Sequence, residues 1–460
     1  MSTRASRRHP ILVILVALAV LSTPALLFAH AHLLRSNPLN GETLTGPPRR
    51  LALWFSEKPE LAFTSITLAD TAGKTFAVGK AAAIDSMGVM VDVTDSVPPG
   101  KYQVAWKTAA ADGHATSGSF FFTVAAPANQ GAAAADTGQV PVIRVDTVIT
   151  HRVIANSLVV PQQVTVFSTA MHWAELVALL GMIGFAIFRL AILPASEWPS
   201  DLTRIASDRA LRLSRGLLVL FAVTTATRGF AQADLMPGFI GSRFAALATL
   251  VQSTHWGFAW AIGAVGTAVV FLGLIVAGRS MSGWVTAAIG LIAICVSEAL
   301  TGHSAAVSRA ALAVAADVAH VLGAGGWLGG LLAVVLCGMP AAATLNVAAA
   351  NERGSRLIRS YHRTATECVT IVVISALVAA WTRFPSLPSL WTTPYGWALI
   401  RKTIAVAVIV GLGIYHWRRV VIPDWTTDVR ARFRRTAVAE LFFGAIVLAL
   451  TAVLLTRPLP

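Results

Sequence analysis

Two kinds of hydrophobic pattern divide this chain of 460 residues. Between residues 33 and 125, apolar and polar positions alternate, as they do in strands whose successive side chains point to opposite faces. Turn-forming sequences such as Gly46-Pro47-Pro48 and Pro98-Pro99-Gly100 separate the alternating segments. The predicted strands cover residues 50–56, 65–70, 74–79, 88–94, 101–108 and 118–124. Many short strands at this spacing predict a small all-β domain, a sandwich or a Greek-key barrel.

After residue 165 the alternation gives way to apolar runs of about 20 residues, the length that spans a bilayer. The runs cover residues 168–193, 211–232, 255–277, 283–301, 311–337, 366–384, 396–417 and 436–456. They predict an all-α polytopic membrane domain of about eight helices within residues 166–457. Residues 126–165 begin with small and polar side chains and are predicted to be a linker.

The first 29 residues have the three parts of a secretory signal peptide. Arg4, Arg7 and Arg8 precede an apolar segment, and Leu27-Phe28-Ala29 is a permissive cleavage site. An uncleaved first transmembrane helix is the alternative interpretation. Cleavage after Ala29 makes His30 the first residue of the mature chain, and cleavage after Ala31 makes it His32. The domain of residues 30–125 is therefore predicted to be exported.

Composition and charge support a multi-pass membrane protein rather than a nucleic-acid-binding one. The chain is 55% hydrophobic and 13% charged, whereas soluble proteins carry about 25% charged residues. The net charge of +14 comes from arginines between the apolar runs, without a basic block interleaved with aromatic residues. These arginines concentrate in the loops around 204–215, 353–363 and 430–435. By the positive-inside rule, this distribution places the N-terminal domain on the extracytoplasmic (periplasmic) side of the cytoplasmic membrane, with the lipid bilayer as a partner.

A histidine at the mature N-terminus offers two nitrogen ligands, the α-amine and the imidazole. The α-amine has a pKa of about 8 and readily loses its proton to a metal ion, and nitrogen donors of this kind suit Cu(II). Just before the last predicted strand, Asp112 and His114 are two positions apart, so an extended backbone places both on one face. A turn at Asp112-Gly113 is the alternative explanation of that pair.

Together, the two histidine-bearing stretches resemble the CopC family of copper-binding proteins. The resemblance rests on His30-Ala31-His32-Leu33 with Pro38, and on Ala111-Asp112-Gly113-His114 with Ser117-Gly118. In that family the mature chain begins with histidine and a proline follows eight positions on, which favours His30. The resemblance implies that one Cu(II) binds to His30, Asp112 and His114, with His32 as a secondary ligand.

Ionisable side chains inside membrane spans are costly, so each is a candidate for function. Under the topology above, the outer half of the membrane domain holds seven of them. They are His172, Glu175, His255, Glu298, His303, Asp317 and His320. We interpret them as a candidate path for copper, since imidazole and carboxylate groups are ligands for it. Interfacial polar residues and a buried Asp317–His320 pair are the alternatives.

The membrane part resembles the CopD family of membrane proteins. The motif runs from Asp317 through His320, Gly323 and Trp327 to Gly329-Gly330; Thr301-Gly302-His303-Ser304, Pro394-Tyr395-Gly396 with Lys402, and Glu440 fit the same family. CopC and CopD occur as separate chains and as fusions, including the YcnJ type, and this chain resembles a fusion. The resemblance implies copper uptake or resistance without enzymatic activity, with other extracytoplasmic copper proteins as partners.

Two other functions are compatible with parts of the sequence. An N-terminal histidine with a second histidine also forms the copper site of polysaccharide monooxygenases, but here Asp112 would help to fill the position that oxygen needs. Paired membrane histidines also ligate haem in electron carriers, and His172, His255, His303 and His320 are the candidates for such a site.

Overall fold

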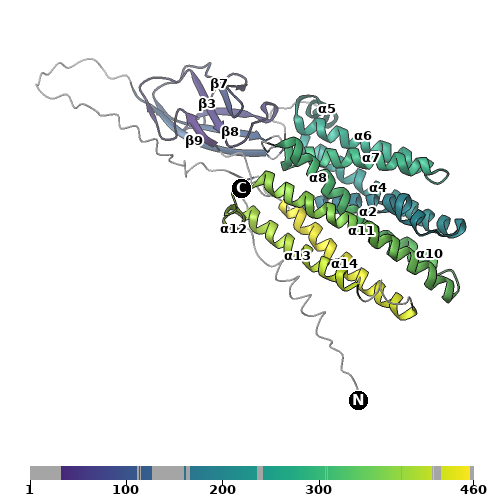
Figure 1. Ribbon diagram of the computed structural model, residues 1–460. Helices are drawn as coiled ribbons and strands as arrows, with labels where there is room; N and C mark the ends of the chain where they lie inside the picture. Colours follow the sequence, from purple (N-terminus) through teal and green to yellow (C-terminus); the bar gives the residue numbers. More distant parts are fainter. Residues whose placement is uncertain are drawn as a thin grey trace, which may run out of the picture. The chain divides into compact units, whose positions relative to one another are not determined.

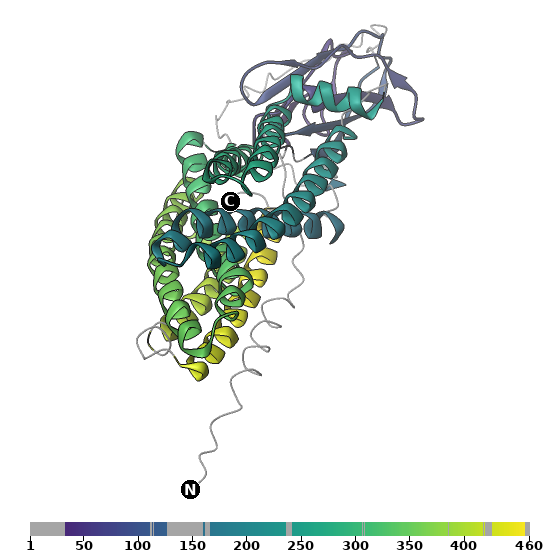
Figure 2. The same cartoon turned by 90° about the vertical axis from the view of Figure 1, so that its right-hand side faces the viewer.

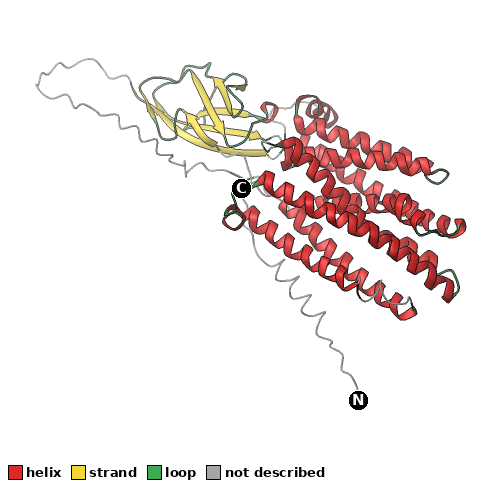
Figure 3. Cartoon of the chain, in the orientation of Figure 1, coloured by secondary structure: helices red, strands yellow, loops and turns green. Residues whose placement is uncertain are grey.

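The computed structural model describes residues 33–110, 113, 115–126, 160–161, 166–235, 242–305, 307, 309–384, 386–416, 418 and 426–455. It divides into two compact units. One contains the strands and the other the long helices (Figure 3). The predicted fold class, an all-β domain followed by an all-α membrane domain, is confirmed.

The β domain consists of two sheets. The first has the strand order β1 (Leu33–Asn37), β3 (Arg50–Phe55), β7 (Gly88–Asp92), β6 (Ala82–Ala83). The second has the order β10 (Val160–Pro161), β9 (Ala115–Val124), β8 (Gly100–Ala109), β4 (Ser65–Asp70), β5 (Thr75–Phe76), and β2 (Thr43–Leu44) pairs with β9 in parallel. All six predicted strands are present, and strand β10 forms within the segment predicted to be linker.

The core of the β domain follows the period of two that the sequence predicts. Phe55, Val89 and Val91 from the first sheet and Trp106 and Phe122 from the second are almost fully buried in one cluster. The rings of Phe55 and Trp106 pack edge to face, with their centroids 5.1 Å apart. Alternation gives Trp54 the opposite orientation, and its indole N–H donates to Asp85 at 3.0 Å.

The described part of the helical domain contains eight helices that are long and apolar enough to span a membrane. They run alongside one another in Figure 1, and Figure 2 shows the same bundle after a turn of 90°. Their labelled segments are α2 (Val166–Ile187), α4 (Ser200–Ala233), α6 (His255–Val276), α7 (Met281–Leu300), α8 (Ala310–Ala324), α11 (Val347–Arg383), α13 (Pro394–His416) and α14 (Thr427–Leu454). We call the end of the bundle at which α2 begins the first end, and the opposite end the second end.

Shorter elements complete this domain. A π-helical turn, η2 (Phe188–Ile192), and α3 (Leu193–Ala195) prolong α2, and α5 (Arg243–Ser253) precedes α6. The 3-10 turn η3 (His303–Ala305) follows α7, and α12 (Ser389–Thr392) precedes α13. Helix α8 continues through η4 (Gly325–Gly329), α9 (Gly330–Ala333), η5 (Val334–Gly338) and α10 (Met339–Ala342), where η4 and η5 are π-helical.

Helix α2 crosses the prolonged α8 in backbone contact. A Cβ atom added to Gly184 would lie 1.9 Å from the carbonyl carbon of Gly329, and one added to Gly329 would lie 2.0 Å from the oxygen of Leu180. Small residues let membrane helices approach this closely, and the gain in dispersion contacts holds them together. The crossing accounts for Gly325 and Gly329, while Gly323 and Gly326 allow α11 to approach at Cys368.

Candidate metal sites

The residues predicted to bind Cu(II) in the exported domain, His30, His32, Asp112 and His114, lie outside the described residues. Their immediate neighbours are described. Leu33 begins β1, directly after the two N-terminal histidines. Ala109 ends β8 and Ala115 begins β9, so Asp112 and His114 belong to the connection between these two strands.

These neighbours lie at one end of the β domain. Leu33 pairs with Phe55 across β1 and β3. The Phe55 ring contacts Trp106, which precedes the end of β8 by three residues, and Ala109 pairs with Ala115 at that end. Two segments that are far apart in the sequence therefore approach the same end of the sandwich.

The connection between β8 and β9 begins as a tight turn. The amide of Gly113 donates to the carbonyl of Ala110 at 2.9 Å, and Gly113 has a φ of +80°. That value lies in the left-handed region, which glycine adopts without a steric penalty. A turn therefore follows Ala110 at Gly113, whereas Asp112 and His114 on either side of this glycine lie outside the described residues.

At the first end of the helical domain, Arg228 of α4 bridges two carboxylates. Its Nη1 atom lies 2.6 Å from Oε2 of Glu175 on α2 and 3.0 Å from Oε2 of Glu298 on α7. Its Nη2 atom donates to the hydroxyl of Thr301 at 3.3 Å. When both carboxylates are ionised, two negative charges share the one positive charge of Arg228.

The surroundings of this triad supply further partners. The Thr225 hydroxyl donates to Oε1 of Glu175 at 2.7 Å, and the Trp256 ring centre lies 5.8 Å from the guanidinium carbon of Arg228. His172, one turn before Glu175, places Nδ1 3.8 Å from Oε2 of that carboxylate. The Glu175 side chain is only 3% exposed, whereas that of His172 is 29% exposed. The histidine is therefore the more accessible of these two candidate ligands.

A second ion pair joins α8 to the last residue of α11. Nη2 of Arg383 lies 2.5 Å from Oδ2 of Asp317, and the Ser304 hydroxyl bonds to both side chains. His303, adjacent to Ser304, is buried with its ring centroid 6.3 Å from that of Tyr395.

The other two histidines of the predicted path are His320 on α8 and His255 on α6. Nδ1 of His320 lies 3.2 Å from the Ser375 hydroxyl on α11. His255 is the first residue of α6 and follows the capping residue Thr254. Among the described residues, no three His, Cys, Asp or Glu side chains come close enough to hold one metal ion. The described residues of the predicted copper path therefore form several polar groups and no single metal site.

Arg228 is the main residue that the sequence interpretation missed. It lies inside the predicted span 211–232, and an arginine within a span is costly unless it is paired. The presence of an ionisable side chain inside a span, which identified the carboxylates as candidates, identifies Arg228 equally well. Arg383 lies near the end of the predicted span 366–384, and the structure pairs it with Asp317.

Family comparisons agree with this division of the chain. The model of the CopC domain matches residues 33–125. The model described as "Copper resistance protein D-like, N-terminal domain" matches residues 163–313, and that of "Copper resistance protein D" matches residues 355–454.

Individual proteins resemble either the whole chain or its β domain. The copper transport protein CutJ of Bacillus subtilis is 25% identical over 457 residues, which is 97% of this chain and 77% of that protein. Protein YobA of Escherichia coli is 32% identical over 113 residues, 24% of this chain and 91% of that protein. The crystal structure of CopC from Methylosinus trichosporium OB3b has 26% identity, covers 21% of this chain and 94% of that one, and has a TM-score of 0.20.

Proposed function

Because this chain belongs to the copper resistance family, with CopC and CopD domains fused, we propose that it captures Cu(II) outside the cytoplasmic membrane. The ligands are the α-amine and imidazole of His30, with Asp112 and His114, and His32 lies beside them. The observation that carries this proposal is that Leu33 and the β8–β9 connection reach the same end of the sandwich.

The first end of the helical domain receives the copper in this proposal. That end lies on the extracytoplasmic side of the membrane under the topology that the arginines predict. When both of its carboxylates are ionised, the Arg228 triad favours a cation there. Histidines 172, 255, 303 and 320 supply imidazoles, while Glu175, Glu298 and Asp317 attract the cation and hold the arginines in place.

The capture site is tested by titrating the purified full chain with Cu(II) and recording electron paramagnetic resonance spectra. We expect one site per chain with nitrogen ligands in the wild type. Inserting an alanine between Ala29 and His30 moves the α-amine away from His30, so its nitrogen signal is lost or altered. Asp112→Ala and His114→Ala weaken the site, whereas Asp201→Asn, an exposed carboxylate in α4, leaves it unchanged.

Two results would contradict the capture site. Equal binding by the wild type and the insertion variant means that the amine is not a ligand. If Asp112→Ala and His114→Ala bind copper as the wild type does, the site lies elsewhere in the chain. Uptake of copper by vesicles that contain the full chain then tests the second step, which we expect His172→Ala to slow without changing the exported site.

A further inference from the structure

A cavity of about 370 Å³ lies among α11, α13, α14 and Trp327, away from the residues proposed to bind copper. Small-molecule sites in proteins have volumes of roughly 300–1,000 Å³, with mostly apolar and aromatic walls and a few polar groups. A metal ion would occupy a small part of this volume, and no three metal-ligating side chains gather here among the described residues. The volume therefore points to an organic ligand.

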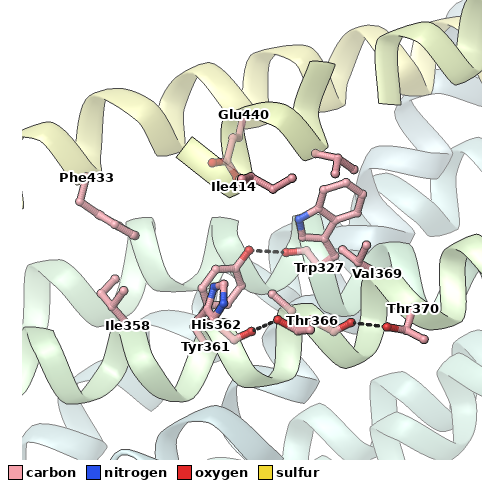
Figure 4. Close-up of a pocket in the computed structure, with 13 residues that line it drawn as sticks. Trp327, Ile358, Tyr361, His362, Thr366, Val369, Thr370, Ile414, Phe433 and Glu440 are labelled. Atoms are coloured by element: carbon pink, nitrogen blue, oxygen red, sulfur yellow. Dashed lines mark hydrogen bonds between the residues drawn. The ribbon is translucent and has the colours of Figure 1, made fainter. Parts of the chain in front are cut away.

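The walls of the cavity are suited to a flat ring. Figure 4 shows Phe433 and Trp327 at opposite sides, with Tyr361 between them. The Tyr361 hydroxyl donates to the Trp327 carbonyl at 3.1 Å, which fixes the orientation of the tyrosine ring. Aromatic pairs gain about 0.5–1.5 kcal/mol beyond the burial of their area. A ligand ring bound among Phe433, Trp327 and Tyr361 gains the same kind of aromatic contact.

Two ionisable groups give the cavity a polar side. Glu440 lies above Tyr361 in Figure 4, and His362 follows Tyr361 on α11. Glu440 is only 3% exposed and is 13 residues from the start of α14, so it is deep within the helix. A carboxylate at this depth stabilises a ligand that donates a hydrogen bond. It repels phosphates and fatty-acid carboxylates, which disfavours lipid headgroups of those kinds.

The cavity opens on the surface that faces the membrane lipid. Its lining includes Thr366, Thr370 and Ile414, which are all exposed. The neighbouring positions of the same helices carry exposed apolar side chains, among them Ile371, Ile374 and Ile404. Since these helices are long and apolar enough to span a membrane, a ligand reaches the cavity from within the bilayer and must be lipid-soluble.

We propose that this cavity binds the ring of a lipid-soluble hydroquinone, with a ring hydroxyl donating a hydrogen bond to the Glu440 carboxylate. The aromatic walls hold the ring, and the apolar tail leaves through the opening between α11 and α13. This site is separate from the copper site, so it stands whether or not the chain transports copper.

The probes are 2-decylhydroquinone and decylbenzene, which share the ring and the tail and differ in the two hydroxyls. Binding of each to the full chain in lipid nanodiscs is measured by titration calorimetry. We expect saturable one-to-one binding of decylhydroquinone and an affinity for decylbenzene about tenfold lower, since a hydrogen bond to a charged group is lost. Glu440→Gln keeps a neutral acceptor and loses only the charge, so it should weaken decylhydroquinone by about fivefold and leave decylbenzene unchanged.

Two further variants keep the test decisive. Glu367→Gln alters an exposed carboxylate on α11 and should bind as the wild type does. Gly413→Leu places a side chain at a lining position where a Cβ has no neighbour within 4 Å, so it should fill the cavity and abolish binding of both probes. Equal affinity for the two probes, unchanged binding in Glu440→Gln or Gly413→Leu, or no saturable binding in the wild type would each overturn the proposal.

Discussion

Arg228 illustrates how one side chain determines what its neighbours can do. Without it, the buried carboxylate of Glu175 and the partly buried carboxylate of Glu298 would repel each other, and their charge would be costly inside a membrane. With it, they form hydrogen bonds at 2.6 and 3.0 Å that join α2 to α4 and α4 to α7. These ion pairs support a stabilising role for both carboxylates as directly as they support a role in metal binding.

Replacing this arginine should destabilise the helical domain strongly. Arg228→Gln leaves two carboxylates without a countercharge, and we expect the free energy of unfolding to fall by about 3 kcal/mol. The measurement is chemical unfolding of the full chain in detergent. The matched control is Arg243→Gln, whose ion pair with Asp234 is exposed and should contribute under about 1 kcal/mol.

A second replacement identifies the cause of that loss. Adding Glu298→Gln to Arg228→Gln removes one of the two negative charges, so part of the lost stability should return. If the double variant is no more stable than Arg228→Gln, charge is not what makes the arginine necessary.

At the scale of whole elements, the crossing of α2 and the prolonged α8 fixes how the bundle packs. Gly184 and Gly329 allow backbone contact there, and the two π-helical turns lie at and just after the crossing. Such turns are rare and occur often at functional sites. Here they belong to the segment that also carries Asp317 and His320, so the geometry of the crossing affects where these side chains lie.

Adding a single methyl group at the crossing should separate the helices. Gly184→Ala places a Cβ where the Gly329 backbone lies, and we expect a loss of about 2 kcal/mol in unfolding free energy. Gly216→Ala in α4 is the control because its Cβ would have no neighbour within 4 Å, so that variant should be neutral or slightly stabilised. Equal stability of the two variants would show that the contact is not tight in solution.

The sequence predicted elements better than contacts between them. The period of two identified every strand of five or more residues except β1 (Leu33–Asn37), and apolar length identified all eight spans, because both depend on local burial. The interpretation of Glu175, Glu298 and Asp317 as ligands used each residue separately. Their pairing with Arg228 and Arg383 depends on residues 53 to 70 positions away, which periodicity does not reveal. The copper ligands His30, Asp112 and His114 remain predictions.

For the whole molecule, the central prediction is the orientation across the membrane. Cys295, Cys337 and Cys368 are buried, so the native chain should react little with maleimide reagents. Arg243→Cys, at the first end, should be labelled by an impermeant maleimide in intact cells. Arg279→Cys, between α6 and α7, is also exposed and should be labelled only after permeabilisation. The reverse pattern would place the first end inside and refute the proposed route of copper.

The ion pairs at the first end also constrain how the chain is made. Glu175 precedes Arg228 by 53 residues and Glu298 follows it by 70, so the three helices of the triad leave the ribosome one after another. Helix α2 alone would carry an uncompensated carboxylate into the bilayer, whereas α2 and α4 together carry a neutral pair. Insertion of these two helices as one hairpin is therefore favoured, and α7 joins a hairpin whose arginine is already in place.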